Sequence, residues 1–156
     1  MADSAFHVKI EGAERLQEAL KDPKLLKGPI ADFLKKSGAY VELAAKERAP
    51  VDTGHMKSTI AFKVKETEVE IGTNVFYAPY VEFGTRPHFP PSSALEGWAR
   101  KHGFGPGGGF LVARAISRRG TKKQPFLVPA LQGAKSAIDG FLKEAINKIE
   151  AFWERK

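Results

Sequence analysis

The stretch from Tyr77 to Pro91, YAPYVEFGTRPHFPP, limits what this chain can fold into more than any other part of the sequence. It is too apolar for an idle loop and too rich in Pro and Gly for a helix. The pattern predicts a short strand at about 80–83, which Gly84 and Pro87 bring to an end. The prolines of 86–91 fix φ and extend the residues before them, so this segment is predicted to project as a stiff arm. The alternative is a plain loop between two elements of a monomer.

Alternation of apolar and polar residues predicts the strands. A short strand is expected at 6–10, and an antiparallel hairpin is expected from 60–64 and 69–71. Residues 75–83 would return as a third strand and make the sheet a meander.

Apolar residues at helical spacing predict the helices, of which the longest are at Pro29 to Arg48 and from about Leu131 to Trp153. Shorter helices are predicted at 13–20, 92–103 and 110–117. The sequence thus predicts an α+β fold, in which a small antiparallel sheet packs in two layers against a central helix and a long C-terminal helix.

Length and composition favour one domain over 1–156, because 42% of the 156 residues are hydrophobic. The glycine-rich segment 105–109 is predicted to be a flexible break within a mobile insertion at about 103–123. The absence of cysteine excludes disulfides and thiolate metal sites, and it favours an intracellular or virion location. No apolar run approaches the length of a membrane span and no secretory pattern opens the chain, so a soluble, untargeted protein is expected.

The excess positive charge lies mainly in one part of the chain. The formal net charge is +7, and between Gly97 and Ile138 there is no acidic residue. Such a block predicts a positive surface for a polyanion or an acidic protein, although a solvated, solubilising surface has the same composition. Its central cations are Arg114, Arg118, Arg119, Lys122 and Lys123.

The sequence offers no persuasive active site, metal site or cofactor site. The histidines lack paired metal-ligand spacing, and the segment 105–109 lacks the GK[ST] ending of a phosphate-binding loop. Asp52, His55 and Ser58 share one short turn, whereas catalytic triads are assembled from separate elements. Glu82 is predicted to be satisfied by backbone amides, by Arg86 or by an arginine of a neighbouring subunit.

Three separated blocks carry a resemblance to a known family. They are APVDTGHMKSTI at 49–60, YAPYVEFGT at 77–85 and PFLVPAL at 125–131. In this order, with a helix before them and a β-hairpin between the first two, they resemble the small head-tail joining and tail-completion proteins of long-tailed bacteriophages and prophages. Met56 in place of Leu and the position of Thr59 are mild departures, and the insertion at 92–121 is longer than in the shortest members.

This resemblance implies a virion structural protein, with no catalytic activity and no cofactor, that forms a ring at the head-tail junction. The ring would be a hexamer or dodecamer, would be assembled in the host cytoplasm and would pass double-stranded DNA through its lumen. It would contact other neck, portal or tail proteins and no membrane. The predicted subunit contacts are Tyr77, Tyr80, Glu82, Phe83, Arg86, Pro87 and Phe89, while the basic block would face DNA or a partner protein.

Two other functions fit parts of the sequence. A stand-alone nucleic-acid-binding domain would use the basic block as its footprint and would bind as a monomer with steep salt dependence. An enzyme would combine His55 or His88 with Asp52 or Glu82, and this hypothesis ranks below the other two. Sedimentation at several concentrations would separate a ring-forming subunit from a monomeric DNA-binding domain.

Overall fold

The computed structural model describes residues 23–65 and 67–154, so the predicted strand at 6–10 and the predicted helix at 13–20 lie outside the described residues. The chain divides into two compact units. Of the described residues, the first unit comprises 23–39, 63–65, 67–70 and 135–154, and the second comprises 40–62 and 71–134. One domain over 1–156 stays a prediction.

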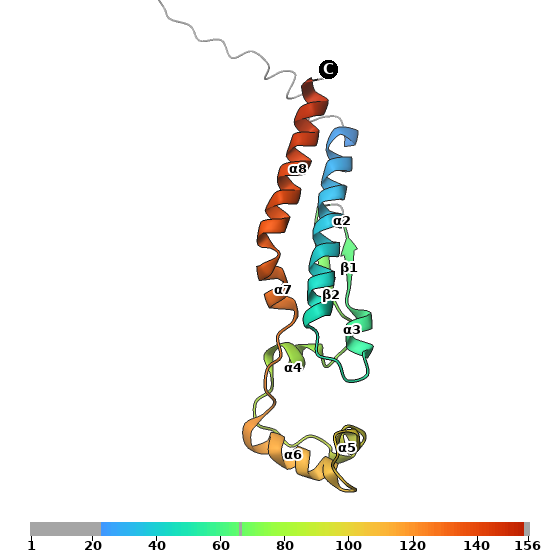
Figure 1. The fold of residues 1–156 in the computed structure, drawn as a ribbon, viewed down its shortest axis with the longest axis vertical. Coiled ribbons are helices and arrows are strands. Elements are labelled where there is room, and N and C mark those ends of the chain that lie inside the picture. The colour runs from blue at the N-terminus through green and yellow to red at the C-terminus, as the bar shows by residue number, and fades with distance from the viewer. Residues whose placement is uncertain (1–22, 66, 155–156) are drawn as a thin grey trace, which may run out of the picture. The chain divides into compact units, whose positions relative to one another are not determined.

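Helices dominate the described residues, as Figure 1 shows. The elements follow one another in the order α2 (Pro23–Arg48), α3 (His55–Thr59), β1 (Ala61–Val64), β2 (Val69–Gly72), α4 (Ala78–Phe83), α5 (Ser92–Lys101), α6 (Gly108–Arg119), α7 (Leu127–Gly133) and α8 (Lys135–Glu154).

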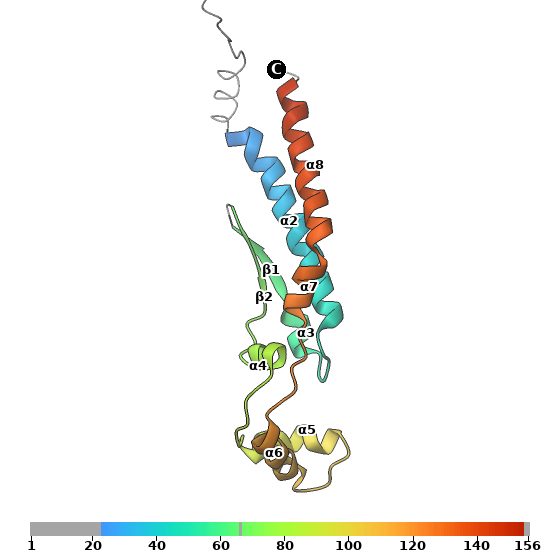
Figure 2. The same cartoon turned by 90° about the vertical axis from the view of Figure 1, so that its left-hand side faces the viewer.

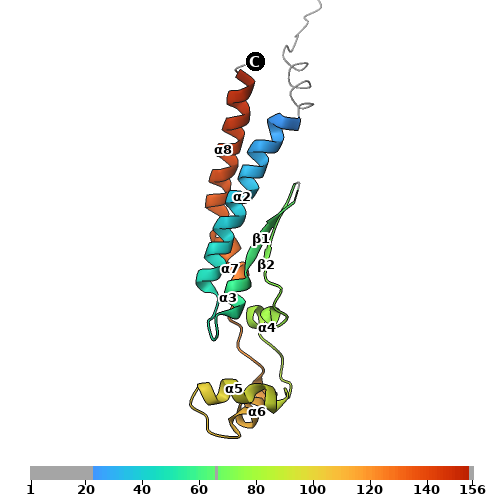
Figure 3. The same ribbon diagram turned by 90° about the vertical axis from the view of Figure 1, so that its right-hand side faces the viewer.

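The first unit contains the N-terminal part of α2, the end of the hairpin and α8. Figures 2 and 3 show α2 between the hairpin and α8. Leu34 of α2 and Ala145 of α8 are buried. Lys36 Nζ lies 2.6 Å from Glu144 Oε2, but this ion pair is exposed and contributes little to stability. Burial of the apolar stripes therefore stabilises the pair of helices.

The hairpin formed by β1 and β2 confirms the sequence prediction. The Lys65 N–H donates to the Glu68 carbonyl at 2.8 Å across the turn. The Lys65 ammonium lies 3.0 Å from Glu68 Oε1 and also pairs with Glu70 on β2. The hydrogen bonds to Glu70 and Glu68 raise the pKa of Lys65. These are opposite charges at the end of the hairpin, and they favour its pairing modestly.

The prediction of a third strand in the meander is wrong, because residues 78–83 form the helix α4. Pro79 stands in the first turn of α4, where a helix does not use its missing N–H, whereas in a central strand it would remove a ladder bond. Phe76, Tyr80 and Phe83 lie at helical spacing, a pattern that competes with the alternation. The sheet therefore has two strands in the described residues, and the α+β class is confirmed.

The longer helices match their predictions with shifted ends. α2 begins at Pro23, so Pro29 lies inside the helix and not near its start. The long C-terminal helix is confirmed as α8, and α7 precedes it with a break at Ala134. The helices predicted at 92–103 and 110–117 are confirmed as α5 and α6.

The second unit has its core around small and β-branched side chains. Val41 and Ala45, four residues apart, share one face of α2 and are almost fully buried. Ile60 before β1 and Phe126 before α7 are buried in the same unit. The Glu42 carboxylate accepts the Phe62 N–H at 3.1 Å and so ties α2 to β1.

Helices α5 and α6 pack against each other through small residues. Ala99 and Ala113 are fully buried, and a Cβ on Gly109 would lie 2.3 Å from the Ser92 carbonyl oxygen. The Glu96 carboxylate accepts the N–H groups of Gly107 at 2.9 Å and of Gly109 at 2.8 Å. These bonds, from Gly109 first and then Gly107, lower the pKa of Glu96. The glycine-rich segment is thus bound to α5, and the mobility of the insertion stays a prediction.

Candidate subunit-contact surface

Helix α4 carries its aromatic side chains outwards. Ala78 and Glu82 are buried, with Glu82 only 6% exposed, whereas Tyr80 is 58% exposed and Phe83 is 71% exposed. A surface helix in water normally shows the opposite arrangement, with apolar residues inside and acids outside. Helix α4 therefore presents an apolar outer face and buries its one acid, Glu82.

The carboxylate of Glu82 binds the start of α7. Its Oε2 accepts the N–H of Phe126 at 2.7 Å and of Leu127 at 3.0 Å, and its Oε1 accepts the N–H of Val128 at 2.9 Å. The first N–H groups of a helix have no partner within the helix, so the carboxylate satisfies them and favours the positive end of the helix dipole. Burial raises the pKa of Glu82, but the three hydrogen bonds outweigh burial and leave that pKa below its ordinary value.

This arrangement settles which of the predicted partners Glu82 uses. Backbone amides hold both carboxylate oxygens, as one of the three alternatives predicted. The side chain is directed into its own chain, so its hydrogen bonds are not offered to another copy. Through Glu82 the second sequence block, YAPYVEFGT, is tied to the third, PFLVPAL.

Two Gly-Thr pairs form a narrow crossing of the chain, which we call the Gly-Thr crossing (Gly84-Thr85 and Gly120-Thr121). The threonines make an antiparallel bridge, in which the Thr85 N–H donates to the Thr121 carbonyl at 3.3 Å and the Thr121 N–H donates to Thr85 Oγ1 at 3.0 Å. A Cβ on Gly120 would lie 1.9 Å from the Thr85 carbonyl oxygen, and one on Gly84 would lie 2.6 Å from the Thr121 carbonyl oxygen. Both glycines have positive φ, so larger residues do not fit there.

The predicted arm, 86–91, leaves this crossing without regular secondary structure. Arg86, Pro87 and Phe89 are exposed. The Phe89 ring is not free of its own chain, because its centroid lies 6.0 Å from that of Phe110 in α6. Arg86 and Pro87 line one hollow of about 670 Å³ together with Tyr80 of α4. The arm thus continues the apolar surface of α4.

The predicted contact residues therefore have three kinds of placement. Tyr80, Phe83, Arg86, Pro87 and Phe89 are exposed, Tyr77 is half-buried, and Glu82 is buried.

Sequence reasoning missed Phe76, which precedes α4 and is 84% exposed. Its ring meets that of Tyr77 edge-on, with the centroids 5.4 Å apart. The spacing of Phe76 from Tyr80 and Phe83 was the available signal, because residues four and seven apart share one face of a helix.

The predicted basic block lies on α6 and on the segment that follows it. Arg114, Arg118 and Arg119 are exposed on α6, and Lys122 and Lys123 are exposed beyond the Gly-Thr crossing. Arg114, Arg118 and Arg119 line a hollow with Leu111 and Ala115. Within 23–65 and 67–154, no carboxylate forms an ion pair with any of these five cations.

The residues considered for catalysis have structural partners. The Asp52 carboxylate accepts a hydrogen bond from the Lys101 ammonium at 2.6 Å. The Ser58 hydroxyl donates to the backbone carbonyl of His55 at 2.8 Å, so Asp52, His55 and Ser58 do not form a relay. In the described part of the chain, no group of three or more His, Asp or Glu side chains could hold a metal ion. None of the helices described there is long and apolar enough to cross a membrane.

Comparison with protein families gives one match. The model of the family described as "Bacteriophage HK97-gp10, putative tail-component" matches residues 12–84. This match confirms the resemblance to phage tail-component proteins. It includes the first sequence block and most of the second, and it ends at Gly84, before the arm, α5, α6 and the third block. No curated protein and no solved structure matches the chain.

Proposed function

From the match of residues 12–84 to a bacteriophage tail-component family, we propose that this chain is a structural subunit of the virion at the junction of head and tail. Copies of the chain join through the outer face of α4 and the arm, and a heterologous contact of this kind closes into a ring when the rotation between copies is suitable. The lumen of the ring gives passage to double-stranded DNA. The role is assembly and not catalysis.

The inverted pattern of α4 is the observation that supports this proposal. Tyr80 and Phe83 are more than half exposed on a helix whose one acid is buried. Taking one large apolar side chain fully out of water stabilises a complex by about 1.5–3 kcal/mol. Aromatic anchors of this kind are also enriched at the centres of protein interfaces. A second copy that covers this face removes the unfavourable exposure.

The backbone beneath this face is fixed before any partner arrives. Glu82 ties α4 to α7, and the Gly-Thr crossing holds the chain immediately after α4. A surface that is already ordered loses less conformational entropy on binding, which favours association. Glu82 therefore fixes the backbone of α4, and the side chains of Tyr80 and Phe83 make the contact with the second copy.

We expect the double variant Y80A/F83A to lose self-association while it keeps the fold. Removing two aromatic anchors should weaken association at least about ten-fold, because each is worth more than 1 kcal/mol when buried. Sedimentation velocity over a range of concentrations, with electron microscopy of any rings, measures this. L142A is the matched control, since Leu142 is also a large exposed apolar residue but lies on α8.

The same variant is also tested in phage particles. A phage that lacks this gene should accumulate heads and tails that are not joined, and the wild-type gene should restore infectious particles while Y80A/F83A should not. Rings of Y80A/F83A indistinguishable from the wild type, or infectious particles made without the gene, would show the proposal to be wrong.

A further inference from the structure

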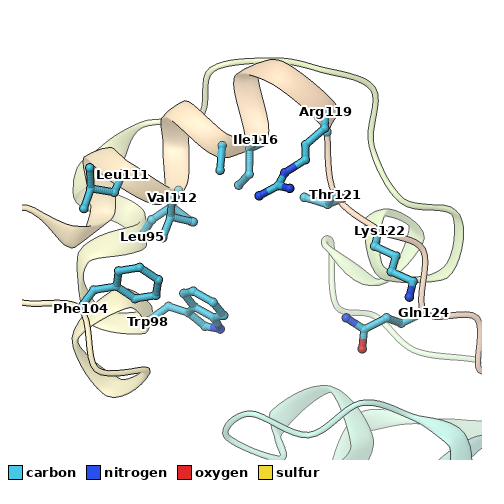
Figure 4. Close-up of a pocket in the computed structure, with 12 residues that line it drawn as sticks. Leu95, Trp98, Phe104, Leu111, Val112, Ile116, Arg119, Thr121, Lys122 and Gln124 are labelled. Carbon is cyan, nitrogen blue, oxygen red and sulfur yellow. The ribbon is translucent and has the colours of Figure 1, made fainter.

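A groove lies between α5, α6 and the segment after α6. No residue of α4 lines it, although five residues line both this groove and the hollow beside Tyr80: Leu95, Ile116, Thr121, Lys122 and Gln124. Figure 4 shows its side chains, and its volume is about 600 Å³. Leu111, Val112 and Ile116 of α6 line it, with Trp98 and Phe104 on one side and Lys122 on another. We call this the α5–α6 groove.

Stacked aromatic rings form the apolar side of the groove. The Trp98 ring stacks on that of His102, with the centroids 3.9 Å apart, and lies 6.5 Å from that of Phe104. Trp98, Phe104 and Leu111 are nevertheless exposed. Nucleic-acid phosphates would gain nothing from these carbon surfaces, because phosphate binding needs charge and hydrogen-bond donors. An apolar ligand surface would gain the burial.

The cations of the basic block border the same groove. Arg119 and Lys122 are lining residues, and Arg118 precedes Arg119 on the exposed side of α6. No acidic residue occurs anywhere between 97 and 138 to neutralise them. A ligand that combines an apolar strip with carboxylates is therefore complementary to both parts of the groove.

A second copy of this chain is a poor source of such carboxylates. Most acids that the structure describes already have partners within the chain: Glu82 and Glu96 accept backbone N–H groups, and six others form ion pairs. Those six are Asp32, Glu42, Asp52, Glu68, Glu70 and Glu144.

We propose that the α5–α6 groove binds an amphipathic segment of a different protein, which places apolar side chains against Trp98 and Leu111 and carboxylates beside Arg119 and Lys122. That this partner belongs to the virion rests on the proposed function. The chemistry of the segment rests on the groove alone. Helix-in-groove recognition by apolar anchors is a common mode of binding for such surfaces.

Fluorescence anisotropy with labelled synthetic peptides tests this with the full chain. The first probe is a helix-forming peptide with Leu on one face and Glu beside it. The second has Ser in place of each Leu, the third has Lys in place of each Glu, and a short DNA duplex is the fourth. The Leu/Glu peptide should bind at least about ten-fold more tightly than the Ser/Glu and Leu/Lys peptides, since it alone matches both parts of the groove.

Variants locate the binding. R119E/K122E reverses the charge at the groove and L111S removes an exposed apolar contact, and each should weaken the Leu/Glu peptide by about ten-fold or more. K57E reverses an exposed charge on α3 and should change binding by less than about two-fold. Leu111 is exposed, so L111S should unfold at the same temperature as the wild type, which circular dichroism checks.

Several outcomes would overturn the proposal. Equal binding of the Leu/Glu and Ser/Glu peptides would mean that charge alone acts, and tight binding of the duplex with no peptide binding would make the surface a nucleic-acid site. Loss of self-association in L111S would assign the groove to a second copy. The Y80A/F83A variant should bind the Leu/Glu peptide like the wild type, so failure of the ring contact and failure of the groove are distinguishable.

Discussion

The carboxylate of Glu82 joins α4 to residues that follow it by more than forty positions in the chain, at the first turn of α7. Its pKa is depressed below the ordinary 4.5. A carboxyl group of this kind stabilises the fold above its pKa in the unfolded chain, and the stabilisation is lost as the pH falls through the lower value of the folded state. The side chain therefore contributes fully at neutral pH.

Substitution E82Q should lower the free energy of unfolding at neutral pH by about 1–3 kcal/mol, because the amide leaves buried N–H groups of α7 with poorer acceptors. As the pH falls below 4.5, the wild type loses its advantage and the two proteins should converge. Urea unfolding of both proteins, at neutral pH and again below pH 4.5, measures the difference.

The control for this substitution is E47Q, since Glu47 is an exposed acid on α2. It should leave the free energy of unfolding within about 0.5 kcal/mol of the wild type. An E82Q protein as stable as the wild type at neutral pH, or a difference that does not shrink in acid, would contradict the role of the carboxylate.

Among the described elements, the hairpin of β1 and β2 and the long helices were predictable and α4 was not. The hairpin has an alternating pattern and a polar turn, and α2 and α8 carry long apolar stripes. In α4 the alternation around Tyr80 and Glu82 resembles a strand, and the decisive contact comes from distant N–H groups that no local pattern reveals.

The candidate site was predictable in its residues more than in its geometry. The exposed aromatics Tyr80, Phe83 and Phe89 were recognised from their types and from the prolines nearby, whereas the inward direction of Glu82 follows from the helix and not from a strand. Gly84 and Gly120 belong to matching Gly-Thr pairs, but their separation in the chain concealed that they meet.

At the Gly-Thr crossing, G120A should destabilise the protein by more than about 2 kcal/mol, because the residue has φ +71° and its Cβ would collide with the Thr85 carbonyl. G140A is the control: Gly140 lies within α8 with nothing near its Cβ position, so alanine there should be neutral or stabilising by up to about 1 kcal/mol. Urea denaturation of both variants gives the comparison, and equal effects would contradict the need for a glycine at the crossing.

For the molecule as a whole, the Gly-Thr crossing separates one segment from the rest of its unit. Residues 86–119 begin and end at adjacent points, since Thr85 and Thr121 are bridged. The buried contacts of this segment are largely its own: Gly108 approaches Ala99 and Phe104, and Gly109 approaches Ser92. The ion pair of Lys101 with Asp52 connects it to the remainder, but this pair is exposed and contributes little.

Replacement of 86–119 by a short Gly-Ser linker should therefore leave a folded protein with a cooperative thermal transition. The shortened chain should lose binding of the Leu/Glu peptide, because it lacks α5 and α6. Circular dichroism and anisotropy measure the two properties. A shortened chain without cooperative unfolding would show that the segment is part of the folding core.

The same crossing has a consequence for how such a chain can change over time. The bridge between Thr85 and Thr121 already brings the two ends of the segment 86–119 together. A segment of another length or sequence can therefore take its place while the backbone outside it keeps its conformation. Recombination between phages could then exchange this whole segment in one event and give the chain a new associate at the α5–α6 groove, while the outer face of α4, which lies outside the segment, would stay unchanged.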